Sequence, residues 1–173
     1  MKTILVVDDD KLNLSAARKV LSGEYKVIPV VRGTQVLSYL ENEECDMILL
    51  DISMPEMDGF ELLREIRTME NGKDIPVIFL TADNDTETET RCFKEGAIDF
   101  IVKPFVPAVM QSRIGRALEL EELRRGLADK LEKKTREVSD IKSKSYQDVL
   151  TGLWNRACLL YTSPSPRDAH ESR

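Results

Sequence analysis

The sequence has little histidine, few cysteines and no long apolar run. His170 is the one histidine among 173 residues, so a histidine nucleophile, a catalytic triad and a histidine zinc site are all but excluded. The three cysteines, Cys45, Cys92 and Cys158, form no Cys-x-x-Cys pair, which predicts reduced thiols rather than a disulfide framework. No run approaches the roughly 20 apolar residues that a membrane-spanning helix needs.

An excess of positive charge is also missing. Lys and Arg number 25 against 31 Asp and Glu, which gives a formal net charge of −6. Tight, non-specific binding to nucleic acid needs clustered cations, so we expect no direct nucleic-acid partner. The N-terminal apolar run is interrupted by Asp8, Asp9 and Asp10 too early for a signal peptide, and we expect a cytoplasmic protein without membrane contact.

What is present is a regular alternation of short apolar runs and amphipathic segments. The apolar runs, typical of strands buried on both faces, are residues 3–7, 25–30, 47–50, 75–80 and 98–102. Helices are predicted over residues 11–22, 34–41, 60–69 and 87–95 and from about residue 106 to 146. This alternation predicts an α/β fold, a doubly wound five-stranded parallel sheet with an extended C-terminal helix.

Polar side chains stand where the predicted strands end. Asp8 and Asp9 follow the first strand, Asp51 the third, Thr81 the fourth and Lys103 the fifth. Ligands of such sheets bind beyond the carboxyl ends of the strands, so we expect these groups to share one edge. Crowded carboxylates are tolerable around a cation, and hard oxygen ligands suit Mg²⁺. The pattern favours phosphoryl transfer to Asp51 as a nucleophile, with Lys103 and Thr81 contacting the phosphoryl oxygens.

Four motifs resemble those of the receiver domain of two-component response regulators. They are VVDDD at 6–10, LLDISMPEMDG at 49–59, LTA at 80–82 and KPF at 103–105. The resemblance covers residues 1–120 and implies a flavodoxin-like sheet with strand order 2-1-3-4-5. It also implies a switch that receives a phosphoryl group on Asp51 from a partner histidine kinase or phosphotransfer protein.

The resemblance assigns further roles at the same edge. It implies that Asp9, Asp51 and the main-chain carbonyl of Ser53 ligate Mg²⁺ directly, while Asp8 acts through water. Thr81 and Lys103 match the switch hydroxyl and the phosphate-binding lysine of the family.

Other residues admit more than one interpretation. Phe100 matches the family's switch aromatic, although a plain core or surface aromatic is the alternative, and a cis bond is implied before Pro104. A simpler explanation of the acids at the strand ends is that each one only caps a neighbouring helix, and this explanation suits Asp10. An aspartyl phosphatase on a similar sheet would have a second Asp two positions after the nucleophile, where this chain has Ser53.

A long charged helix is predicted to continue beyond the receiver, with residues 121–147 as a linker. Apolar residues recur in two rows at seven-residue multiples, interrupted by Arg124 and Lys134: Met110, Ala117, Leu131 and Val138 in one, Leu120, Leu127 and Ile141 in the other. The rows favour a parallel coiled coil, and therefore a homodimer that phosphorylation promotes. A solitary solvated helix is the alternative.

The last residues resemble the opening of another domain. Residues 148–160 begin with DVLTGLWNR, similar to the start of the GGDEF domain, the diguanylate cyclase module, but the cyclase's Gly-Gly-(Asp/Glu)-(Asp/Glu)-Phe loop is missing. Residues 161–173 are predicted to be a disordered tail or an artefact. We expect a phospho-accepting switch, not itself an enzyme, with a diguanylate cyclase as its output. The alternatives are an active cyclase fragment and a stand-alone or DNA-binding response regulator.

Overall fold

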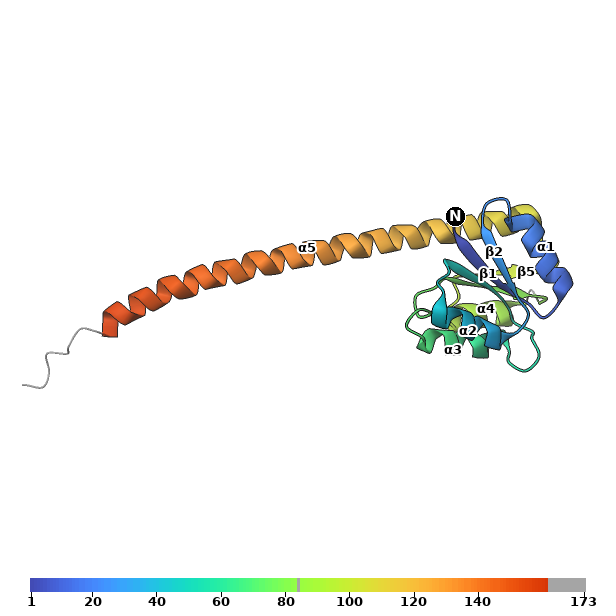
Figure 1. The fold of residues 1–173 in the computed structure, drawn as a ribbon, viewed down its shortest axis with the longest axis horizontal. Coiled ribbons are helices and arrows are strands. Elements are labelled where there is room, and N and C mark those ends of the chain that lie inside the picture. Colours follow the sequence, from blue (N-terminus) through green and yellow to red (C-terminus); the bar gives the residue numbers. More distant parts are fainter. Residues whose placement is uncertain (84, 162–173) are drawn as a thin grey trace, which may run out of the picture. The chain divides into compact units, whose positions relative to one another are not determined.

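A five-stranded parallel sheet organises the N-terminal part of the chain (Figure 1). The computed structural model describes residues 1–83 and 85–161, with side chains as far as residue 141. The strands are β1 (Thr3–Val7), β2 (Lys26–Val30), β3 (Met47–Asp51), β4 (Val77–Thr81) and β5 (Asp99–Val102). They lie in the order β2-β1-β3-β4-β5, which confirms the predicted doubly wound fold.

Helices follow each strand in turn, as the alternation predicts. They are α1 (Lys11–Leu21), α2 (Gly33–Asn42), α3 (Gly59–Thr68), α4 (Thr86–Lys94) and α5 (Pro107–Tyr161). Side-chain caps are present at the starts of α1, α3 and α4. The carboxylate of Asp10 accepts a hydrogen bond from the backbone N–H of Leu12 at 2.8 Å, and Asp58 forms a reciprocal capping box with Glu61 at the start of α3.

Two apolar layers bury the two faces of the sheet. On β1, Ile4 and Val6 pack against α1 and the first part of α5, while Leu5 and Val7 pack against α2, α3 and α4. All four are fully buried, so the strand alternates between the two layers with the period of two that extended backbone imposes. Figure 1 shows the same division, with α1 and α5 on one side of the sheet and the other helices opposite.

Helix α5 differs from the sequence prediction in two ways. Its backbone stays helical to Tyr161, beyond the predicted end near residue 146, since no proline interrupts residues 108–161. Met110 and Ala117, assigned to an exposed dimer seam, are instead 0% and 8% exposed and pack in the domain core. The seven-residue row includes these two core residues because the face of a helix that covers a sheet is apolar at nearly the same spacing as a coiled-coil seam.

The chain divides into two compact units, Met1–Leu123 and the segment from Arg124 onward. In the second unit the described backbone is helical as far as Tyr161. The remainder of the predicted tail, residues 162–173, lies outside the described residues. Within the described part of the chain, no helix combines the length and the apolar character that crossing a bilayer requires.

Candidate functional site

The carboxyl edge of the sheet brings the predicted residues together. Asp8 directly follows β1, Asp51 and Thr81 are the last residues of β3 and β4, and Lys103 directly follows β5. In the parallel register Asp51 lies opposite Leu80 of β4, one residue before Thr81. All the strands point the same way, so these ends fall on the same edge without any distortion of the backbone.

Ion pairs from one partly buried lysine lie at the centre of the site. The ammonium of Lys103 lies 2.7 Å from Asp8 Oδ2 and 2.8 Å from Asp51 Oδ1. The side chains of Asp8 and Asp51 are only 1% and 4% exposed, and that of Lys103 is 17% exposed. Buried carboxylates are costly without partners, so Lys103 is what makes this pair of acids tolerable in the folded protein.

The acids still carry more charge than Lys103 offsets. One oxygen from each of Asp8, Asp9 and Asp51 lies within 4.8 Å of the other two, and Asp9 is exposed. Three carboxylates and one ammonium leave a formal charge of −2. Moreover, Asp8 Oδ2 and Asp51 Oδ1 are buried, and the Lys103 ammonium, 2.7 and 2.8 Å away, is the partner that the structure describes for both oxygens. Buried, under-coordinated oxygens with this net charge fit a divalent cation that prefers oxygen ligands.

The pKa values of the central pair follow from burial and pairing. Burial raises the pKa of Asp51 above its usual value and outweighs the opposing effect of Lys103, while the nearby charge of Asp8 raises it further. Burial lowers the pKa of Lys103, but its hydrogen bonds to Asp51 and Asp8 and their negative charges outweigh burial, so its pKa is raised overall. The lysine is therefore a fixed positive charge at neutral pH.

The start of α1 orients Asp8, in part through Asn13, a residue that the sequence did not single out. Asp8 Oδ1 accepts hydrogen bonds from the backbone N–H of Asp10 at 2.8 Å and from Nδ2 of Asn13 at 3.2 Å. The first turn of α1 thereby fixes the Asp8 carboxylate, leaving Oδ2 directed to Lys103. Asn13 carries no signal in a single sequence, because an asparagine near a helix start is most often an ordinary capping or surface residue.

Gly59 permits a close approach of two segments behind Asp51. A Cβ at this position would lie 2.3 Å from the carbonyl oxygen of Asp51 and 2.9 Å from Cα of Ile52. The Gly59 N–H donates to the carbonyl of Ile52 at 2.9 Å, closing the loop between β3 and α3. Ser53 lies in this loop, and its backbone N–H contributes a hydrogen bond that lowers the pKa of Asp51. The glycine of the LLDISMPEMDG motif is thus required by backbone packing.

The two expected switch residues, Thr81 and Phe100, make their described contacts with residues other than the three acids. The hydroxyl of Thr81 donates to the carbonyl of Asp83 at 3.1 Å and accepts from the Asp83 N–H at 3.0 Å. Phe100, half-buried on β5, meets Phe93 of α4 edge-on with ring centroids 5.9 Å apart. The guanidinium of Arg113 on α5 lies 5.5 Å from the Phe100 ring centroid. Phe100 therefore connects α4 and α5.

One backbone feature accompanies Lys103 at the edge. The Lys103–Pro104 peptide bond is cis, as the resemblance implied. The Lys103 N–H donates to the carbonyl of Thr81 at 2.7 Å, which ties the end of β5 to the end of β4.

Fold and site together define a doubly wound α/β domain whose carboxyl edge can hold a cation beside a buried aspartate. The family model described as the response regulator receiver domain matches residues 4–115. The chain therefore belongs to the response regulator receiver family. Receivers of this family are phospho-accepting switches of two-component signalling.

Relatives of known description agree with this assignment. A probable cyclic di-GMP phosphodiesterase of Vibrio cholerae is 36% identical over 117 residues, covering 68% of this chain but 26% of that protein. The two-component response regulator ORR5 of Oryza sativa subsp. japonica is 34% identical over 117 residues, covering 66% of this chain and 87% of the rice protein.

The solved structure of one similar receiver domain contains a magnesium ion. The receiver domain of the sensor histidine kinase PA1611 of Pseudomonas aeruginosa PAO1, with a magnesium ion coordinated in its active site cleft, is 34% identical and superposes with a TM-score of 0.63. The match covers 68% of this chain and 98% of that one. In this chain, Asp8, Asp9 and Asp51 are close enough together to hold a metal ion.

Removing Lys103 should destabilise the metal-free protein. Lys103→Met leaves Asp8 and Asp51 buried without their shared partner, and loss of one member of a buried pair costs about 3–5 kcal/mol. We expect urea unfolding in the presence of a chelator to show a loss of this order, part of which returns with excess Mg²⁺. Lys73→Met, which removes an exposed pair with Glu70, is the control and should change little. Equal, small losses in both variants would contradict this account.

Proposed function

We propose that Asp51 is the phospho-acceptor of this receiver, with Mg²⁺ as the required cofactor. The observation that carries the proposal is the pairing of the buried Asp51 carboxylate with Lys103 beside two further acids. Asp51 ends a fully buried strand, so it presents a fixed carboxylate at the carboxyl edge where ligands of such sheets bind. Geometry of this kind suits phosphoryl transfer, which depends mainly on positioning and charge neutralisation.

In the proposed step, a carboxylate oxygen of Asp51 forms a bond to phosphorus. The bond between phosphorus and a histidine nitrogen of the donor protein breaks, and that nitrogen leaves with the electron pair. The donor is a histidine kinase or a histidine phosphotransfer protein. Lys103 turns from its carboxylate partners to the oxygens of the acyl phosphate, since it is already within reach of Asp51.

The metal ligands proposed are Asp9, Asp51 and the main-chain carbonyl of Ser53, with Asp8 acting through a water molecule. Asp9 is the exposed member of the cluster and Asp8 the fully buried one, which is consistent with this division. Bound Mg²⁺ supplies positive charge that offsets the repulsion between these carboxylates and the incoming phosphoryl oxygens.

The proposed switch links the site to the face formed by α4, β5 and α5. Thr81 exchanges its hydrogen bonds with Asp83 for one to a phosphoryl oxygen, which pulls on the loop leading into α4. Phe100 then moves inward, and its contacts with Phe93 and Arg113 transmit the change to α4 and α5. Asp99 also forms an ion pair with Arg113 at 2.5 Å, so the same arginine contacts two neighbouring residues of β5, Asp99 and Phe100.

The proposed output is an appended diguanylate cyclase domain. DVLTGLWNR at residues 148–156 supports it by its resemblance to the start of a GGDEF domain. The Vibrio relative, described as a probable cyclic di-GMP phosphodiesterase, extends well beyond the part that matches this chain and concerns the same second messenger. Sequencing the reading frame that follows residue 160 tests this output: a cyclase loop supports it, and a different domain refutes it.

Asp51→Asn tests the acceptor. We expect wild-type protein incubated with Mg²⁺ and a small phosphodonor to gain one phosphoryl group, mapped to Asp51 by mass spectrometry after stabilising reduction. Asp51→Asn should gain none, because an amide lacks the nucleophilic oxygen charge. Asp46→Asn, outside the cluster, is the control and should be modified like wild type. Modification of another residue, or of the Asp51 variant at the normal rate, defeats the proposal.

We further propose that α5 mediates phosphorylation-dependent homodimerisation through its exposed apolar row in the second unit. Leu127, Leu131, Val138 and Ile141 are 61%, 66%, 53% and 67% exposed, and their spacings of four, seven and three residues place them at core positions of one heptad pattern. Lys134 interrupts the row, so the seam is weak enough for one phosphoryl group to bias its pairing.

Leu131→Lys tests the seam. We expect sedimentation of wild type to shift towards dimer with a phosphoryl mimic and Mg²⁺, with a change in the dimerisation constant of roughly 5- to 150-fold, the usual range of allosteric coupling. Leu131→Lys should abolish the shift and leave Asp51 phosphorylation intact. Ser139→Lys adds the same charge outside the apolar row and should retain the shift. An unchanged mass distribution in wild type makes α5 a passive spacer.

A further inference from the structure

Helix α4 is held to the rest of the domain by little apolar packing. Of its residues Thr86–Lys94, all of them described, one is buried, Cys92. A helix with so few buried contacts can be displaced at a low cost in free energy. The polar and aromatic contacts that α4 makes with its neighbours therefore have a large share in setting its position.

The C-terminal end of α4 is fixed to α3 by two arginines. The guanidinium of Arg64 forms a bidentate ion pair with the Glu95 carboxylate, at 3.0 and 2.5 Å. Arg67 donates to the carbonyl of Gly96 at 3.4 Å and to that of Ile75, ahead of β4, at 2.8 Å. Both arginines belong to α3, whose apolar face packs in the core, so this end of α4 has a firm anchor.

The remainder of α4 has a different attachment. Its N-terminal end follows Asp83, whose hydrogen bonds with Thr81 are broken in the proposed switch. Between the two ends, the guanidinium carbon of Arg91 lies 4.0 Å from the centroid of the Phe60 ring. Phe60 is only 2% exposed, whereas Arg91 is exposed, so a solvated cation lies over a buried ring. This cation–π contact holds the middle of α4 against α3.

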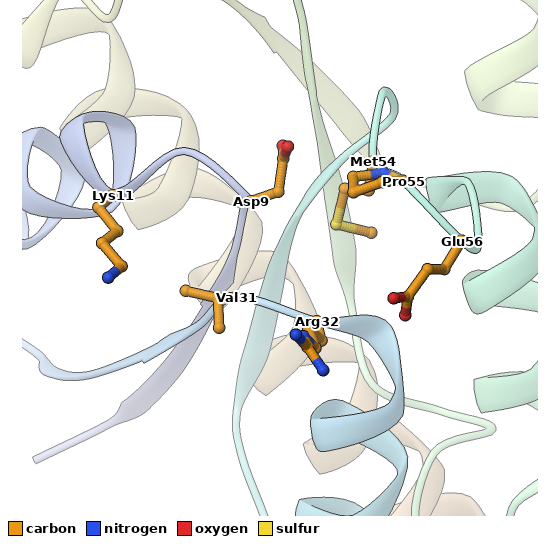
Figure 2. Close-up of a pocket in the computed structure, with 7 residues that line it drawn as sticks. All are labelled: Asp9, Lys11, Val31, Arg32, Met54, Pro55 and Glu56. Atoms are coloured by element: carbon orange, nitrogen blue, oxygen red, sulfur yellow. The ribbon is translucent and has the colours of Figure 1, made fainter.

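Phe60 also connects this contact to the proposed acceptor. It follows Gly59, the glycine whose backbone lies against the carbonyl of Asp51. Its ring packs against Phe79 of β4, with the two centroids 4.8 Å apart. The loop that joins β3 to α3 also lines the hollow beside Asp9 that Figure 2 shows. The ring under Arg91 is thus attached to the backbone that positions the acid cluster.

We propose that Arg91, stacked on Phe60, restrains α4 in the position of the unphosphorylated protein and opposes phosphorylation of Asp51. The inference rests on the proposed function. When the phosphoryl group draws Thr81 away from Asp83, the N-terminal end of α4 moves while its C-terminal end stays anchored to α3. Arg91 lies between the moving end and the anchored end, so this displacement separates it from the ring.

The reciprocity of coupling gives the direction of the effect. A contact that exists only in the unphosphorylated state lowers the affinity for any group that occupies the acceptor as a phosphoryl group does. Removing the contact raises that affinity by the factor that the contact contributes. For an exposed cation over an aromatic ring, this factor is roughly two- to fivefold.

Binding of beryllium fluoride, which mimics an aspartyl phosphate in the presence of Mg²⁺, tests the restraint on the full chain. We expect Arg91→Gln to bind the mimic roughly two- to fivefold more tightly than wild type in a fluorine NMR titration. Arg91→Lys keeps a cation over the ring and should stay close to wild type. Phe60→Leu removes the ring, so adding Arg91→Gln in this background should cause no further change.

Two variants serve as matched controls. Lys94→Gln removes an exposed cation from the next turn of α4, and Arg64→Gln breaks the ion pair at the anchored end. Both should bind the mimic like wild type, because neither change alters the contact with Phe60.

The outcomes separate the inference from the proposed function. Unchanged or weaker binding by Arg91→Gln, an equal gain in either control, or an equal gain from Arg91→Gln in the Phe60→Leu background overturns the inference and leaves Asp51 as acceptor. Failure of wild type to bind the mimic with Mg²⁺, or undiminished binding by Asp51→Asn, defeats the proposed function, and the inference with it.

Discussion

The ion pairs that join Lys103 to Asp8 and Asp51 connect three strands of the sheet through one partly buried lysine. Asp8 follows β1, Asp51 ends β3 and Lys103 follows β5. The Lys103 side chain therefore reaches across the end of β4 to the ends of β3 and β1 at the carboxyl edge. Buried carboxylates need such a partner, and the cost of their desolvation is offset only while the lysine stays close. The geometry of the proposed phosphorylation site is therefore also a condition of folding stability.

The same contacts make the site responsive to ligands. Lys103 balances one of three negative charges, and the remaining charge of −2 attracts a divalent cation. In the proposed switch, a phosphoryl group on Asp51 gives Lys103 and Thr81 new oxygen partners, and each of the two residues gives up an existing contact. Thr81 gives up its bonds with Asp83 ahead of α4. A ligand can shift such an equilibrium only through contacts that differ between the two states, and the proposed switch supplies such a difference at Lys103 and Thr81.

Much of the fold and the acid cluster could be predicted because both depend on patterns of residue type along the chain. Alternating runs gave the sheet, and polar residues at strand ends located Asp8, Asp51 and Lys103. Asn13 and the steric role of Gly59 could not be found this way, because each depends on a three-dimensional contact with a segment whose path the sequence does not specify. The predicted heptad row extends too far towards the N-terminus, since a helix face that covers a sheet and one that pairs with another helix have nearly the same periodicity.

Magnesium binding by the Asp9→Asn variant tests the central claim most directly. Asp9 is the exposed acid of the cluster, and it makes none of the contacts with Lys103 that stabilise the fold. Calorimetric titration should show markedly weaker Mg²⁺ binding than wild type, because a hard ligand and a negative charge are lost together. Unfolding in the presence of a chelator should show metal-free stability that is no lower, since repulsion between the acids is relieved. Unchanged Mg²⁺ affinity, or a clear loss of metal-free stability, would contradict the account.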